Sequence, residues 1–111
     1  MSDKIDTVVF SKAKGKKKKI RAEFFAKDKK KATREFGARG MNDFTIYSKT
    51  DKKLANERKR LYDIRHKERE DWTDMLSNGA LSKFVLWNKP NLQSSMRDFG
   101  KRFNLKVKIN I

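Results

Sequence analysis

The side chains that could support acid–base or metal chemistry are confined to one short segment. His66 is the only histidine of the chain, and Glu68, Glu70, Asp71 and Asp74 follow it closely. Carboxylates of this kind bind hard cations, but their spacing matches no known oxygen-ligand loop. One histidine without any cysteine cannot build a zinc site. The sequence therefore predicts no catalytic site, no metal and no cofactor, and it gives His66 a structural role as a hydrogen-bond donor or helix-dipole partner.

Other function classes are excluded by what the chain lacks. It contains no cysteine, which rules out disulfides and thiol catalysis and is compatible with a reducing compartment. No run of about 18 apolar residues is present, so we expect no membrane span. Residues 1–10 carry two aspartates and no long apolar stretch, which argues against a signal peptide. We expect a non-enzymatic protein that acts through its surface.

Positive charge is the dominant property of the chain. Its 111 residues include 30 Lys and Arg against 14 Asp and Glu, which gives a net charge of +16. The excess is greatest in residues 1–40, which contain 14 basic and 5 acidic residues. A polyanionic partner would relieve the resulting self-repulsion by releasing counterions. The composition favours binding to nucleic acid or to an acidic surface, the alternative being a surface that is merely solvated.

Two clusters of basic residues form the candidate polyanion-binding site. The run from Lys12 to Lys19 is interrupted by a glycine and predicts a mobile arm. This arm would contact phosphates or serve as a nuclear-localisation-like patch, the alternative being an ordinary disordered linker. The first cluster comprises Lys16, Lys17, Lys18, Lys19, Arg21, Lys29, Lys30 and Lys31. The second cluster comprises Arg58, Lys59 and Arg60.

Alternating apolar and polar residues predict β-strands at both ends of the chain. Residues 20–24 and 32–36 flank the polar turn 27–30, so we expect a β-hairpin. Residues 7–10 are a third candidate strand. Residues 105–111 alternate cleanly. This last strand either completes the chain's own sheet, which we favour, or adds to the edge of a partner's sheet.

A highly charged helix is predicted in the middle of the chain. It begins at a cap formed by Thr50 or Asp51 and runs to about Glu68. Leu54, Leu61 and Ile64 form a narrow apolar stripe, and Ala55 and Tyr62 lie beside it. We expect one thin face to dock against the core and the wide charged face to meet solvent or a partner.

Two further helices complete the expected fold. Residues 79–87 are apolar nearly all round, as in a buried helix, and Asn91 caps a final helix. The core face of that final helix consists of Leu92, Met96, Phe99 and Phe103. Gly37 and Gly40 are expected to allow positive φ, and Gly100 to mark a close approach. We predict a small α+β domain over residues 19–111, preceded by a basic arm over residues 1–18 that includes a short strand.

Several blocks of residues together carry a family resemblance. They are Phe36-Gly37-Ala38-Arg39-Gly40-Met41-Asn42-Asp43-Phe44-Thr45, Arg65-His66, Trp72, Gly79-Ala80-Leu81-Ser82, Leu86-Trp87-Asn88-Lys89-Pro90, Asp98 and Arg102-Phe103. Over residues 18–104 the chain resembles an uncharacterised family of small basic proteins encoded by large nucleocytoplasmic DNA viruses. The resemblance implies a viral origin and assembly in the cytoplasm or nucleus of an infected cell. It implies no activity, cofactor or catalytic residue.

Two functions follow as hypotheses. The first is a structural protein of the virion, a minor capsid or internal component, that binds the acidic surface of other virion proteins, with strand addition through residues 105–111 as a further contact. The second is a protein that contacts the phosphates of viral DNA without reading sequence. We favour the first, because small basic proteins of such viruses commonly lie in the particle and because a shell protein needs the folded body that residues 79–90 predict.

Overall fold

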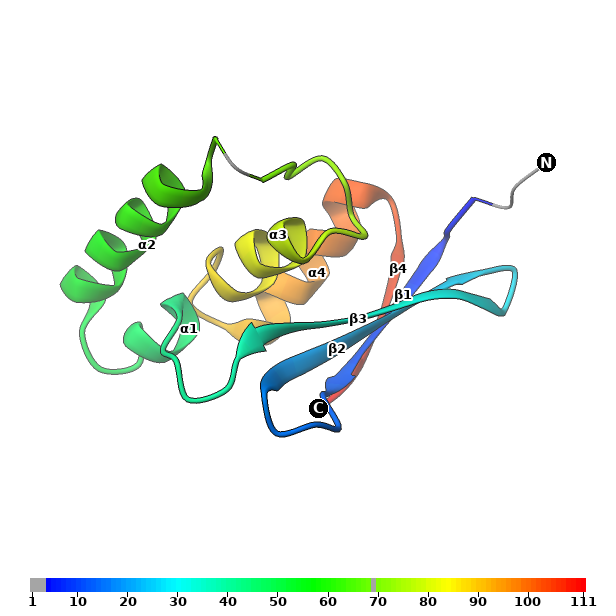
Figure 1. Cartoon of the computed structure of the whole chain (residues 1–111), viewed down its shortest axis with the longest axis horizontal. Coiled ribbons are helices and arrows are strands. Elements are labelled where there is room, and N and C mark those ends of the chain that lie inside the picture. The colour runs from blue at the N-terminus through cyan, green and yellow to red at the C-terminus, as the bar shows by residue number, and fades with distance from the viewer. Residues whose placement is uncertain (1–3, 69) are drawn as a thin grey trace.

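The computed structural model describes residues 4–68 and 70–111. Four strands form one mixed sheet, and the helices cover one of its faces (Figure 1). Among the described residues, no helix covers the opposite face of the sheet. The α+β single-domain fold predicted from the sequence is therefore confirmed.

The strands follow a meander and then a crossover. They are β1 (Thr7–Lys12), β2 (Lys18–Ala26), β3 (Lys29–Ala38) and β4 (Lys106–Asn110), in the spatial order β3-β2-β1-β4. β1–β2 and β2–β3 are antiparallel, whereas β4 lies parallel to β1. The C-terminal strand thus completes the chain's own sheet, as favoured. Because β1 is an inner strand, residues 7–12 belong to the folded body rather than to a separate arm.

The β2–β3 hairpin forms where the sequence predicts it. Lys27 and Asp28 have φ of 50° and 66° and make a two-residue turn with positive φ at both positions, which suits the right-handed twist of the strands. Asp6 accepts a hydrogen bond from the Lys27 N–H at 3.0 Å. The hairpin is longer than expected, since β3 continues to Ala38 through Gly37, whose φ is 79°. Gly40, with φ of 88°, makes the turn after the strand.

The helices follow in one stretch between β3 and β4. They are α1 (Phe44–Tyr47), α2 (Lys52–His66), α3 (Asn78–Leu81), the π-helical turn η1 (Ser82–Leu86) and α4 (Leu92–Phe103). The side chains of Asp43, Asp51, Ser77 and Asn91 cap the α-helices by accepting backbone N–H hydrogen bonds. The apolar segment predicted over residues 79–87 is helical over residues 79–86, and Asn91 is confirmed as a cap. The short helix α1 was not predicted.

The core lies between the sheet and α3, η1 and α4. The largest fully buried side chains are Phe10, Phe24, Phe36, Phe99, Leu81 and Met96. Gly100 brings α4 against β4, since a Cβ at this position would lie 2.3 Å from Val107 Cγ2. The predicted close approach at Gly100 is confirmed, and its partner is the last strand.

The orientation of α2 differs from the prediction. Leu54, Leu61 and Ile64 are 40%, 42% and 62% exposed, whereas Ala55 and Tyr62 are buried. The prediction that the leucine–isoleucine stripe docks was therefore wrong. The physical reason is that the large aromatic ring of Tyr62 provides more contact area than a leucine and turns its own side of the helix inward. In Figure 1, α2 lies at the edge of the helical layer, beside α1 and away from the strands.

Candidate polyanion-binding surface

Lys16 and Lys17 in the loop between β1 and β2, and Lys18 at the first position of β2, form an exposed basic segment. Their side chains have no ion-pair partner within the described residues. The backbone around them is held on both sides, because the Ala13 N–H donates to the Lys19 carbonyl and the Arg39 N–H donates to the Lys17 carbonyl. We call this segment the Lys16–Lys18 loop. It presents three solvated cations on a fixed turn rather than on a mobile arm.

Lys19 has a different role from its neighbours. Its ammonium group forms an ion pair with Asp43 Oδ2 at 2.7 Å, and the exposed fractions of the two side chains are 17% and 4%. It also donates to the Met41 carbonyl. Asp43 in turn accepts from the Ile46 N–H at 3.2 Å and so caps α1. Lys19 therefore anchors α1 to β2, and its charge is neutralised inside the fold.

Arg21 and Lys30 lie on the uncovered face of the sheet and are partly neutralised there. Arg21 is opposite Glu35 in the strand register, with 3.5 Å between Nε and Oε2. Lys30 pairs with Glu23 at 2.6 Å, and this hydrogen bond, with the charge of Lys30, lowers the pKa of Glu23. Lys29 and Lys31 are exposed beside Lys30 at the start of β3.

The two halves of the first predicted cluster are far apart. Lys18 begins β2 and Lys29 follows its end, so the length of the strand separates them by about 25 Å, at ~3.3 Å per residue. In Figure 1 the β1–β2 loop and the β2–β3 turn lie at opposite ends of the sheet. The cluster lies within residues 16–31 of the sequence but forms two separate sites on the molecule.

Arg58, Lys59 and Arg60 also fail to form one patch. Consecutive residues of an α-helix project about 100° apart, so three in a row cannot share a face. Arg60 is exposed and pairs with Glu57 at 2.6 Å. Arg58 lies over the Tyr47 ring, 5.9 Å from its centroid. Lys59 points inward, toward the Asn88 carbonyl.

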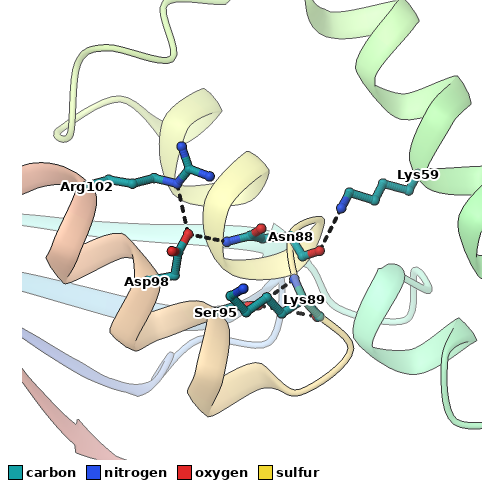
Figure 2. A network of polar contacts seen from close by, with 6 residues as sticks. All are labelled: Lys59, Asn88, Lys89, Ser95, Asp98 and Arg102. Carbon is teal, nitrogen blue, oxygen red and sulfur yellow. Dashed lines mark hydrogen bonds and ion pairs between the residues drawn. The ribbon is translucent and has the colours of Figure 1, made fainter.

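Lys59 joins α2 to the segment that precedes α4. Figure 2 shows its ammonium reaching the Asn88 carbonyl, at 2.8 Å, and it also lies 4.9 Å from the centre of the Phe44 ring. Burial lowers the pKa of Lys59, and the nearby charge of Lys83 adds to this effect. Lys59 is consequently a structural cation and contributes little to an outward-facing basic surface.

The same polar network continues into α4. Asn88 donates its side-chain amide to Asp98 at 2.7 Å, and Arg102 donates to the same carboxylate at 2.8 Å (Figure 2). Burial by itself would raise the pKa of Asp98, but the hydrogen bonds from Arg102 and Asn88 outweigh it, and the pKa lies below its usual value. Ser95 accepts from the Lys89 N–H at 2.9 Å. The polar residues of the Leu86–Pro90 block thus fix the connection between η1 and α4.

The segment around His66 is likewise structural. His66 Nδ1 lies 3.0 Å from Glu70 Oε1, and the Trp72 indole N–H donates to the other oxygen of Glu70 at 3.2 Å. Within residues 4–68 and 70–111, no three His, Asp or Glu side chains are placed to hold a metal ion. Over the same residues, no helix is long and apolar enough to cross a membrane.

The feature that the sequence did not reveal is the exposed apolar side of α2. Leu54, Leu61 and Ile64, which we call the α2 stripe, lie on the solvent side among basic residues. Arg58 and Arg65 follow Leu54 and Leu61 by four residues, so each lies beside the stripe. The sequence shows these three apolar residues at helical spacing, but such spacing predicts a core face and does not reveal that the residues are exposed.

Comparison with protein-family models, with curated proteins and with solved structures found no match for this chain.

Proposed function

We propose that this chain is a non-enzymatic structural protein of a viral particle that binds an acidic protein surface through its lysines and arginines. Association with a particle rests on the resemblance of residues 18–104 to small basic proteins of large DNA viruses. The nature of the contact rests on the surface of α2.

The α2 stripe is the observation that carries the proposal. Apolar side chains that remain exposed and are rimmed by polar groups are typical of protein interaction sites. Here the surroundings are mainly basic, because Lys53, Arg58 and Arg65 are all exposed on the same helix. The one acidic residue between Leu54 and Leu61, Glu57, is paired with Arg60 at 2.6 Å. A protein that only contacted phosphates would have no use for exposed leucine and isoleucine. An acidic protein surface with apolar residues at its centre could contact both the apolar α2 stripe and the basic residues around it.

The distribution of the remaining cations supports a protein with several contacts. The Lys16–Lys18 loop, the Lys29–Lys31 segment and α2 lie at three separate places on a molecule that measures 46 × 28 × 23 Å. One DNA duplex would be gripped best by cations on a single face. Cations on several sides suit a component that lies between neighbouring surfaces.

Binding to DNA phosphates is the second candidate, and the Lys16–Lys18 loop is the observation that favours it. Its three cations are exposed and free of ion pairs within the described residues, so a phosphate backbone could be bound without breaking any internal contact. The two candidates differ in whether DNA binding survives at physiological salt.

A salt titration with random-sequence duplex DNA tests the proposal. We expect weak binding that is lost by ~0.15 M salt, since exposed charges are then screened. Binding that stays tight and independent of sequence, with a steep logarithmic salt slope, would instead establish DNA contact as the function. In that case, Lys16→Ala, Lys17→Ala and Lys18→Ala together should lower the slope by ~0.9 per lost phosphate contact. The matched control is Lys101→Ala, Lys106→Ala and Lys108→Ala together, which removes the same charge from exposed positions outside both clusters.

Two further measurements separate the parts of the proposal. Leu61→Ser with Ile64→Ser should leave DNA binding and stability unchanged while weakening cross-linking to acidic partner proteins. Mass spectrometry of purified particles of the encoding virus should detect the chain. Its absence from them would show that the protein is not a particle component, whereas binding to an acidic protein surface would still be tested by the other measurements.

A further inference from the structure

A cleft of about 830 Å³ opens where α1 meets the end of the sheet and the start of α4. Its position is separate from the α2 stripe, and none of the three stripe residues lines it. Volumes of this size are typical of sites that bind small molecules or short peptide segments. The residues that line it divide into an apolar interior and a basic rim.

The interior of the cleft is formed by aliphatic side chains from four parts of the chain. Ile20 of β2 and Leu86 of η1 are each 4% exposed and form its base. Ile46 of α1 and the C-terminal residue Ile111 line it as well, and they remain 38% and 47% exposed. Two large aliphatic side chains therefore stay accessible to a ligand inside a concave surface, where burying them would be favourable.

The rim of the cleft is basic. Lys12 at the end of β1 and Lys49 after α1 are exposed and have no ion-pair partner within the described residues. Arg39 also lines the cleft, and it is held in place by hydrogen bonds to the carbonyls of Lys18 at 3.3 Å and Ala13 at 3.4 Å. Three cations therefore surround the apolar interior.

The only carboxylate side chain that lines the cleft within the described residues is already neutralised. Asp43 lines the cleft but is only 3% exposed. It pairs with Lys19 at 2.7 Å and caps α1. Within the described residues, Lys12, Arg39 and Lys49 are thus left without a carboxylate side chain as an ion-pair partner. The same Lys19–Asp43 pair fixes α1 against the sheet, so the cleft is formed before any ligand arrives and little ordering cost accompanies binding.

We propose that this cleft binds a short peptide segment of a partner protein in which acidic side chains flank one or two large apolar side chains. The apolar side chains would bury Ile46 and Ile111, and the acidic ones would pair with Lys12, Arg39 and Lys49. A second copy of this chain is a poor occupant, because each copy carries a net charge of +16. The proposal shares an acidic protein partner with the proposed function but uses separate residues, so either can fail alone.

A selection from a library of random dodecapeptides against the full chain tests the proposal. We expect the enriched peptides to combine Asp or Glu with Leu, Ile, Phe or Trp. Their affinity should fall by about tenfold in Ile46→Ser/Ile111→Ser, which removes the apolar contacts, and by a similar factor in Lys12→Glu/Lys49→Glu. The matched control is Lys29→Glu/Lys108→Glu, which makes the same charge change on exposed strand residues outside the cleft.

Each contrary outcome is informative. Failure to enrich any peptide, or enrichment of purely acidic peptides that bind Ile46→Ser/Ile111→Ser normally, would overturn the proposal. An equal loss in the control pair would show that net charge, not the cleft, determines binding. If the cleft variants weaken binding of a labelled single-stranded oligonucleotide and not of the peptides, the cleft is a nucleic-acid site and the proposal is wrong. Persistence of peptide binding in Leu61→Ser/Ile64→Ser would separate this site from the α2 stripe.

Discussion

Tyr62 lies face to face on Trp87, with ring centroids 4.7 Å apart and ring planes inclined by 10°. His66 stacks on Tyr62 as well, at 4.2 Å between centroids. Burial raises the pKa of the Tyr62 hydroxyl, as expected for a phenol that has left water. This aromatic stack, together with the 2.6 Å ion pair between Asp63 and Lys83, determines which side of α2 faces the core. The exposed α2 stripe is a direct consequence.

Removal of the stacked tryptophan should loosen α2 and destabilise the domain. Trp87 is partly buried against the core, so Trp87→Ala should lower the free energy of unfolding by about 2–4 kcal/mol. A double-mutant cycle with Tyr62→Ala should give a coupling of about 0.5–1.5 kcal/mol, the range of a direct aromatic contact. Urea unfolding followed by circular dichroism measures both values.

The control for this prediction is Leu61, which lies next to Tyr62 on α2. Leu61→Ala should change stability by less than about 0.5 kcal/mol, because Leu61 is an exposed surface residue. A loss at Leu61 as large as that at Trp87 would mean that the leucine, and not Tyr62, faces the core. The exposed stripe and the function proposed for it would then be incorrect.

Asp98 should contribute stability that depends on pH. Asp98→Ala deprives Asn88 and Arg102 of their acceptor and should destabilise the domain by about 1–3 kcal/mol at pH 7. Because the folded-state pKa of Asp98 lies below the unfolded value of 3.8, this stability is complete above the unfolded pKa and is lost as the pH falls through the folded pKa. Thermal unfolding of both proteins between neutral and strongly acidic pH should show their difference shrinking. A constant difference would indicate a packing effect. Glu68→Ala, at an exposed position, is the control.

The sequence predicted most strands and helices because their signals are local. Alternation in residues 20–24 and 32–36, the cap at Asn91 and the four-residue spacing along α4 depend on neighbouring residues only. The short helix α1 has too few residues to show a helical period. Its position depends on the Lys19–Asp43 pair, which joins residues 24 positions apart and leaves no local trace.

The candidate site was harder to predict, because charges that are adjacent in the sequence separate in space. Lys16, Lys17 and Lys18 were placed correctly on the surface, whereas Lys19 and Lys59 turn inward to partners that only the fold brings near. A run of lysines in the sequence gives the total charge but does not show which side chains face solvent. The α2 stripe was misassigned for a related reason, since the partner of Tyr62 is Trp87, 25 residues further on.

Lys59 should make the protein relatively more stable at high pH. Its pKa is lowered by burial and by Lys83, so between that value and the unfolded value of 10.5 the folded protein releases a proton that the unfolded chain still holds. Stability contributed by Lys59 therefore rises with pH in this window. Compared with Lys59→Met, which keeps the apolar stem, the wild-type chain should gain stability as the pH approaches 10.5 in urea titrations. Because Lys59→Met retains all other lysines, the comparison cancels their contribution to the pH dependence of stability. Parallel curves for the two proteins would show that Lys59 is fully solvated.

Gly100 should tolerate no side chain, although it lies in the middle of a helix where alanine is normally preferred. A Cβ at this position would lie 2.3 Å from Val107 Cγ2 and 2.9 Å from the backbone oxygen of Leu105. Gly100→Ala should therefore push β4 away from α4 and destabilise the domain by about 1–3 kcal/mol, despite the ~1 kcal/mol that alanine gains in helix propensity.

Gly15→Ala is the matched control, because a Cβ there meets nothing within 4 Å. It should be neutral or slightly stabilising, since alanine restricts the unfolded chain more than glycine does. Thermal unfolding measures both variants, and hydrogen exchange at Val107 and Ile109 should show that the loss in Gly100→Ala is concentrated at the β1–β4 pairing. Stabilisation by Gly100→Ala would mean that β4 does not pack on α4, and it would leave the C-terminal strand free to join a partner's sheet.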